Sequence, residues 1–111
     1  MDERWTLEEL LSRYELEPSI RDIYVEGPFD QFFLQWFLQQ SGLANIVAYP
    51  IDSVHLPGAV LDRLGLEHGN RGRVIALAHE LEATSPRDLR TQVACVVDAD
   101  FDHFLKIRLV S

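Results

Sequence analysis

The chain has 111 residues, a formal net charge of −8 and 47% hydrophobic residues. This length fits one small domain, and the apolar content is enough to fill a core. The acidic charge argues against a general binder of polyanions, which would usually be basic. The single cysteine, Cys95, and a polar N-terminus that is no signal peptide favour the cytoplasm. No apolar run reaches the roughly 20 residues that a membrane helix needs, so we expect no membrane partner.

The first predicted element is a short amphipathic helix. Thr6 and Glu9 form a capping-box pattern, apolar residues then recur at helical spacing, and Pro18 limits the helix. We assign residues 1–19 to this helix and a linker, and residues 20–111 to the main domain.

A short apolar strand and an aromatic helix follow. Residues 22–25 predict the strand, and Gly27 and Pro28 suit the N-cap and first position of a helix that runs to about Gln40. An aromatic stripe of this kind usually forms a core face, and the alternative is a surface on which nucleic-acid bases stack. The stripe consists of Phe29, Phe33 and Phe37, and Phe32 and Trp36 lie beside it.

The middle of the chain contains one more strand and several helical segments. Residues 44–51 predict a strand, in which Pro50 indicates the margin of the sheet. Residues 59–64 fit one or two helical turns, and a longer helix opens at 69–73. The segment 85–88 (Ser-Pro-Arg-Asp) predicts a further helical turn, because it has a hydroxyl cap, a proline at the first position and an acid at the third.

Residues 93–97 form an unbroken apolar run, which is typical of a strand buried on both faces of a parallel sheet. Asp98, Asp100 and Asp102 follow it directly. Only residues 103–111 remain, enough for one helix but not for a helix and another strand. We therefore expect the sheet to stop after its third core strand.

Acidic residues follow two of the predicted strands. Glu26 follows the first predicted strand, and Asp98 and Asp100 follow the third. In parallel sheets the functional site lies beyond the carboxyl ends of the strands, which is where these acids would be. Because side chains alternate along an extended chain, the two aspartates project together and Asp102 continues the series. Neighbouring carboxylates repel unless a cation joins them, so this pattern predicts a site for Mg²⁺ or Mn²⁺. The alternatives are a polar strand end for the aspartates and a helix-start charge for Glu26.

Two longer motifs carry a family resemblance. Residues 24–30 read Tyr-Val-Glu-Gly-Pro-Phe-Asp, and residues 97–102 read Val-Asp-Ala-Asp-Phe-Asp. Their pairing, with two elements between them, resembles the TOPRIM domain, and most of all an uncharacterised family allied to the OLD-type nucleases. The resemblance covers about residues 20–105 and implies a Rossmann-like three-layer α/β/α fold with a mainly parallel sheet. The family's third helix and fourth strand are not matched, which implies a fold truncated after the third core strand.

The resemblance also implies an activity, divalent-metal-dependent cleavage of DNA or RNA, and some members of the family occur in phage defence. Asp98 and Asp100 would hold the metal, and Glu26 would join them or act as general acid and base on the phosphodiester. Arg71 and Arg73 precede a helix that should start at the same sheet edge, where they would contact a phosphate. The alternative for these two arginines is a solvated loop.

Other functions remain open. A catalytically silent TOPRIM-like module that binds a partner protein or senses an effector would suit the acidic charge and the short C-terminal part. Two other classes fit less well. In haloacid-dehalogenase-like phosphatases the Asp-x-Asp motif would follow the first strand, whereas here it follows the third. A receiver domain would need a lysine beyond a later strand, which this chain lacks. We also expect an unpaired sheet edge, which would make the chain self-associate into a homo-oligomer.

Overall fold

The computed structural model describes residues 3–97 and the backbone of residues 108–109. The helices are α1 (Leu7–Leu16), α2 (Pro28–Gln40), α3 (Gly58–Leu64) and α4 (Asn70–Thr84), with a 3₁₀ turn, η1, at Ile51–Ser53. The strands are β1 (Asp22–Val25), β2 (Val47–Pro50), β3 (Val93–Val97) and β4 (Arg108–Leu109). The second strand is shorter than the predicted 44–51, since Ile51 already starts η1.

The strands form one sheet in the order β2-β1-β3-β4. The central strand, β1, pairs in parallel with β2 on one side and β3 on the other, which confirms a mainly parallel sheet. Strand β4 pairs antiparallel with β3 through Val96 and Val97, so the expectation that the sheet ends at its third strand is wrong. Arg108 and Leu109 belong to the segment long enough for one helix, and they are strand residues here, because pairing with β3 gives the backbone groups of both strands partners.

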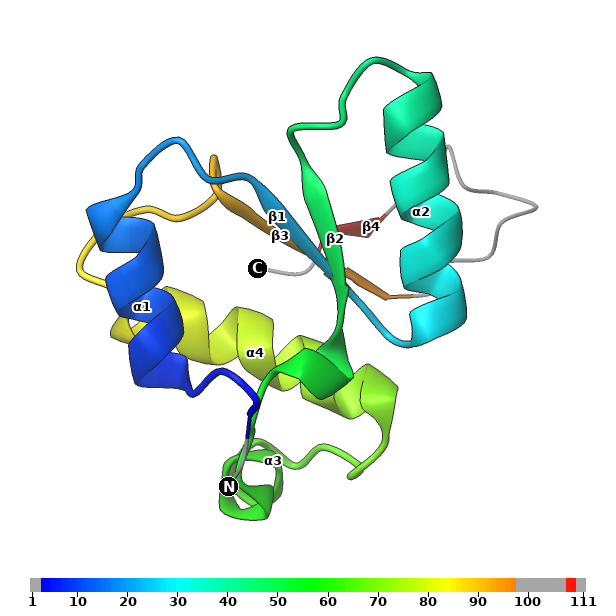
Figure 1. The fold of residues 1–111 in the computed structure, drawn as a ribbon. Helices are drawn as coiled ribbons and strands as arrows, with labels where there is room; N and C mark the ends of the chain where they lie inside the picture. Colours follow the sequence, from blue (N-terminus) through cyan, green and yellow to red (C-terminus); the bar gives the residue numbers. More distant parts are fainter. Residues whose placement is uncertain (1–2, 98–107, 110–111) are drawn as a thin grey trace.

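Helices cover both faces of the sheet (Figure 1). Helix α2 packs on one face, where Leu34 and Leu38 meet Val25 of β1. Helices α1 and α4 pack on the other face, around Tyr24 of β1, with α3 against α4. Side chains alternate along a strand, so successive residues of β1 serve the two cores in turn. The arrangement is a three-layer α/β/α domain, compatible with a Rossmann-like fold.

The helix starts agree with the sequence signals. Thr6 Oγ1 accepts a hydrogen bond from Glu9 N at 3.2 Å, and Glu9 Oε1 accepts one from Thr6 N at 3.0 Å, so the capping box is present. Gly27 caps α2 with Pro28 at its first position. Gly42, just after α2, has a φ of +75°, the left-handed conformation that favours glycine.

The predicted helical turn at 85–88 is wrong. Helix α4 ends at Thr84, and Ser85 has extended backbone angles. Its hydroxyl bonds to the backbone of Arg87, donating to the carbonyl at 2.8 Å and accepting from the N–H at 3.2 Å. Asp88 in turn accepts from Arg90 N at 2.9 Å. Such short-range bonds from side chain to backbone compete with helix formation, and here they win.

The aromatic stripe is not the main core face of α2, which corrects the sequence interpretation: Phe29 is exposed, and Phe33 and Phe37 are only half-buried. The buried side chains of α2 are Leu34 and Leu38, one helical turn apart. Phe29, Phe32 and Trp36 are 76%, 72% and 52% exposed. The smaller leucines lie over the sheet because Gln35, between them in sequence, bonds to the edge strand.

Gln35 covers the outer edge of β2. Its Nε2 donates to Ile46 O at 3.0 Å, and its Oε1 accepts from Ala48 N at 2.8 Å. Val47 N donates inward to the residue that precedes β1, so Ala48 and Pro50 are the residues of β2 whose backbone faces outward. Proline has no N–H. Strand β2 therefore presents no free N–H donor along its outer edge.

Candidate functional site

Glu26 lies at the carboxyl end of the central strand. It follows Val25, the last residue of β1, and β1 pairs in parallel with β3 in a register that aligns Tyr24 with Cys95. Continuing this register places Glu26 level with Val97, the last residue of β3. The prediction that the strand before Glu26 and the strand leading to the Asp-x-Asp motif are parallel neighbours is confirmed.

The surroundings of Glu26 suit a ligand. Its Oε1 is buried and has no hydrogen-bond partner among the described residues. A buried carboxylate oxygen without a donor is unfavourable, so a cation or another donor at this position would stabilise it. The other predicted ligands, Asp98, Asp100 and Asp102, lie outside the described residues. Within residues 3–97, no group of three or more metal-ligating side chains comes together.

A second carboxylate, Asp30, lies in the first turn of α2, directly after the Glu26-Gly27-Pro28 segment. Burial raises the pKa of its side chain above the ordinary aspartate value. Helix N-termini carry a partial positive charge that favours anions. The carboxyl edge of β1 is thus followed by two acids, Glu26 and Asp30, of which the sequence analysis gave a catalytic role to the first alone.

The two predicted phosphate-binding arginines lie at the start of α4. Arg73 Nη1 pairs with Asp52 Oδ1 at 2.8 Å, and its Nη2 donates to Val54 O at 3.3 Å. Asp52 belongs to η1, directly after β2, so the start of α4 lies beside the segment that leaves the carboxyl end of the sheet. These bonds give Arg73 a structural role whatever else it contacts. Arg71 is exposed, and a phosphate contact by either arginine stays a prediction.

A buried polar network, which the sequence analysis missed, lies at the opposite end of β1. Tyr14 Oη donates to Asp22 Oδ2 at 2.7 Å and lies 2.6 Å from Tyr24 Oη. Arg13 Nη2 lies 3.3 Å from the same Asp22 oxygen. Burial raises the pKa of Asp22, and it also raises the pKa of both tyrosines. The signal in the sequence was a charged residue at the first position of an apolar strand, since buried charges require partners.

Aromatic rings enclose the arginine of this network. The Arg13 guanidinium carbon lies 5.5 Å from the ring centre of Trp5 and 5.8 Å from that of Tyr49. Tyr49 in turn stacks on Tyr24 with 5.8 Å between ring centres. These contacts join the N-terminal segment, α1, β1 and β2. They hold the fold together at the amino end of β1, whereas Glu26 lies at the carboxyl end.

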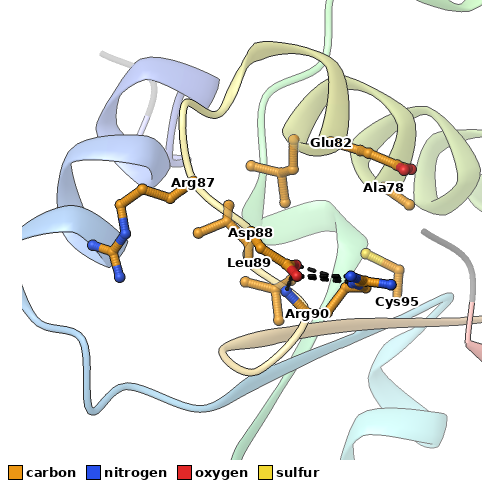
Figure 2. A pocket seen from close by; sticks show the side chains of 9 residues that line it. Ala78, Glu82, Arg87, Asp88, Leu89, Arg90 and Cys95 are labelled. Carbon is orange, nitrogen blue, oxygen red and sulfur yellow. Dashed lines mark hydrogen bonds and ion pairs between the residues drawn. The ribbon is translucent and has the colours of Figure 1, made fainter.

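A cleft of about 360 Å³ opens between α4, the loop before β3 and β3 itself (Figure 2). Arg90 pairs with Asp88 there at 2.8 Å, and Arg87 extends away from that pair. Cys95 is a buried free thiol, and burial raises its pKa to about 12. A neutral thiol is a poor nucleophile, which argues against covalent catalysis by Cys95 at neutral pH. No predicted site residue lines the cleft. Its lining is Ala78, Leu81, Glu82, Arg87, Asp88, Leu89, Arg90, Val93 and Cys95.

Compared with protein-family models, curated proteins and solved structures, the chain matches none of them. Among the described residues, no helix has both the length and the apolar character needed to cross a membrane. The fold and the site define a class, a small α/β domain with a parallel core sheet and an acidic residue at the carboxyl end of its central strand.

Proposed function

We propose that this domain is a divalent-metal-dependent nuclease of the TOPRIM and OLD type, which cleaves phosphodiester bonds in DNA or RNA. The observation that carries the proposal is the position of Glu26. This residue leaves the central strand with a buried oxygen that lacks a partner among the described residues. The neighbouring parallel strand, β3, runs directly into Asp98-Ala99-Asp100.

Each acid has a separate role in this proposal. Asp98 and Asp100 would hold Mg²⁺ or Mn²⁺, with Asp102 as a further contact through water. When bound, the cation would supply positive charge that offsets the charge developing on the phosphate. Glu26 completes the ligand set or moves the proton between the attacking water and the leaving oxygen. Arg71 lies at the start of α4, where its charge favours the nucleic-acid backbone.

The activity test uses plasmid DNA, single-stranded DNA and RNA, each with Mg²⁺, Mn²⁺ or EDTA. Glu26→Gln and Asp98→Asn should each abolish metal-dependent cleavage while the protein stays folded. Glu15→Gln is the matched control, because Glu15 is an exposed acid on α1. Cleavage at the wild-type rate in either site variant would remove that residue from the mechanism, and cleavage that persists in EDTA would contradict the proposal.

Melting curves test the metal site without relying on activity. In EDTA, Asp98→Asn should melt above wild type, because it removes one of several like charges held close together. Metal should reverse this order, since a ligand at a hundredfold excess over its Kd stabilises the folded state by about 2.7 kcal/mol. For a domain of this size that corresponds to a melting shift of about ten degrees. A variant that melts below wild type in EDTA would identify Asp98 as a structural residue instead.

One observation favours the second candidate, a catalytically silent module that binds a protein partner. Helix α2 exposes Phe32 and Trp36 on a chain of net charge −8, and exposed aromatic side chains are typical of protein interfaces. The melting experiment separates the two functions. If wild type shows no shift at millimolar Mg²⁺ or Mn²⁺, the silent module becomes the better description.

A further inference from the structure

The exposed apolar side chains of α2 lie on the side of the helix that faces away from the sheet. Phe29, Phe32 and Trp36 follow the spacing of one helix face, and Leu43, just after the helix, is also exposed. We call these residues the aromatic face. The opposite side of α2 is fixed by buried leucines and by the two hydrogen bonds of Gln35 to β2. The aromatic face is therefore held on a rigid support before any partner binds.

The sequence around the aromatic face carries no charge. Residues 31–51 contain no Asp, Glu, Lys, Arg or His, although one quarter of the chain, 25%, is charged. The one charged residue of α2 is Asp30, in its first turn. Interface cores are depleted of charge and enriched in aromatic residues. Surfaces that bind nucleic acid use Lys or Arg to contact the phosphates, and amphipathic helices use them to bind anionic membranes. This segment contains no Lys and no Arg, so it suits neither kind of partner.

Several properties of this surface suit a second copy of the same chain. Two chains of net charge −8 repel, and a charge-free face is where they can meet without bringing acids together. At about 200 Å² for an aromatic side chain, the exposed fractions of the three rings amount to about 400 Å². Two copies would bury about twice that, and the flanking glutamines bring the total toward the roughly 1,000 Å² of a specific interface. Two-fold dimers are also the commonest oligomers.

We propose that the aromatic face joins two copies of this chain in a dimer with two-fold symmetry and antiparallel α2 helices. Trp36 lies in the middle of the face, so it meets its own counterpart near the symmetry axis. Asp30 lies six residues away, which separates the two Asp30 side chains by about 18 Å along the helix axis. That distance exceeds the screening length of about 8 Å at physiological salt, so their repulsion is small.

The test is sedimentation equilibrium of the 111-residue chain from low micromolar to submillimolar concentration. Wild type should approach twice the monomer mass of 12.8 kDa. Phe32→Glu and Trp36→Glu should each weaken dimerisation at least about thirtyfold, as expected for a central aromatic residue. Leu16→Glu is the matched control, because Leu16 is 80% exposed on α1, and it should leave the dimer intact. Circular dichroism should show all three variants folded, because each replaced side chain is largely exposed.

The other outcomes overturn the proposal. A wild-type protein that stays monomeric throughout the concentration range would contradict the dimer. A dimer that persists in both glutamate variants would locate the contact at the sheet edge instead. A mass that keeps growing with concentration would indicate an open-ended contact. Binding of single-stranded DNA that Trp36→Glu abolishes, with no change in mass, would assign the aromatic face to base stacking.

Discussion

Removing the hydroxyl of Tyr14 should destabilise the fold by about 2–3 kcal/mol. That hydroxyl donates to Asp22 at 2.7 Å and contacts Tyr24 at 2.6 Å, all three side chains being buried. In Tyr14→Phe, Asp22 Oδ2 keeps Arg13 at 3.3 Å, whereas Oδ1 already lacks a partner among the described residues. A hydrogen bond to a charged group contributes about 1.5–3 kcal/mol, and a buried group left without its partner costs a similar amount.

The loss converts into a measurable melting shift. Unfolding entropy of about 2.1 cal/mol/K per residue means that 1 kcal/mol lowers the melting temperature by about 4 °C in a chain of 111 residues. Tyr14→Phe should therefore melt about 9–13 °C below wild type. The matched control is Tyr49→Phe, whose hydroxyl accepts a longer bond, 3.4 Å, from Arg13 and is only half-buried. That variant should lose less than about 1 kcal/mol.

The same experiment has a dependence on pH. The donor at Tyr14 stabilises the ionised form of Asp22, so its removal raises the Asp22 pKa further. The loss in Tyr14→Phe should then be larger at neutral pH than at mildly acidic pH, where Asp22 takes up a proton. Denaturant melts followed by circular dichroism at both pH values measure this difference. A loss no larger than that of Tyr49→Phe, or a loss that does not change with pH, would refute the charged hydrogen-bond network.

Three further outcomes follow from the described residues. In thermal melts, Gly72→Ala should destabilise the protein strongly despite the helical preference of alanine, because a Cβ there would collide with the Glu67 carbonyl. Gly69→Ala is the control, because a Cβ at that position has open space, and it should lower the melting temperature only slightly. Above about pH 10 wild-type stability should fall, because burial raises the pKa of Tyr14 and its tyrosine neighbour, which ionise more readily in the unfolded chain. Burial also raises the Asp22 pKa, so wild-type stability relative to Asp22→Asn should grow as pH falls from neutral toward about 4, as urea titrations would show.

The parts of the fold that local chemistry determines could be predicted from the sequence. The capping box at Thr6, the Gly27-Pro28 helix start and the glycine after α2 act within a few residues, and the structure contains each of them. The apolar runs that end at Val25 and Val97 are buried parallel neighbours, because a strand covered on both faces needs a continuous apolar sequence. The Glu26 edge of the candidate site was predictable for the same reason.

At 85–88 the predicted helical turn is replaced by short-range bonds of Ser85 and Asp88. The other errors arose where distant partners decide the outcome. The buried side of α2 depends on Gln35 reaching Ala48 of β2, thirteen residues further along the chain, and aromatic spacing carries no information about that contact. Strand β4 depends on the open edge of β3. The network around Asp22 joins α1, β1 and Gln92, which directly precedes β3, so only the presence of a charge in an apolar strand indicated it.

The donor-free edge of β2 has a consequence for assembly. A sheet can grow without limit only when both of its edges accept new strands, as in fibrils. Two residues of β2 face outward, Ala48 and Pro50. Proline has no N–H, and the N–H of Ala48 donates to Gln35, so a new strand finds no donor on that side. Edge-to-edge pairing of two such sheets is therefore favoured on the opposite side, where β4 lies beyond β3, and each sheet then has no second edge with free donors to offer. Such pairing ends at two copies, which protects a small acidic domain from β-sheet polymerisation.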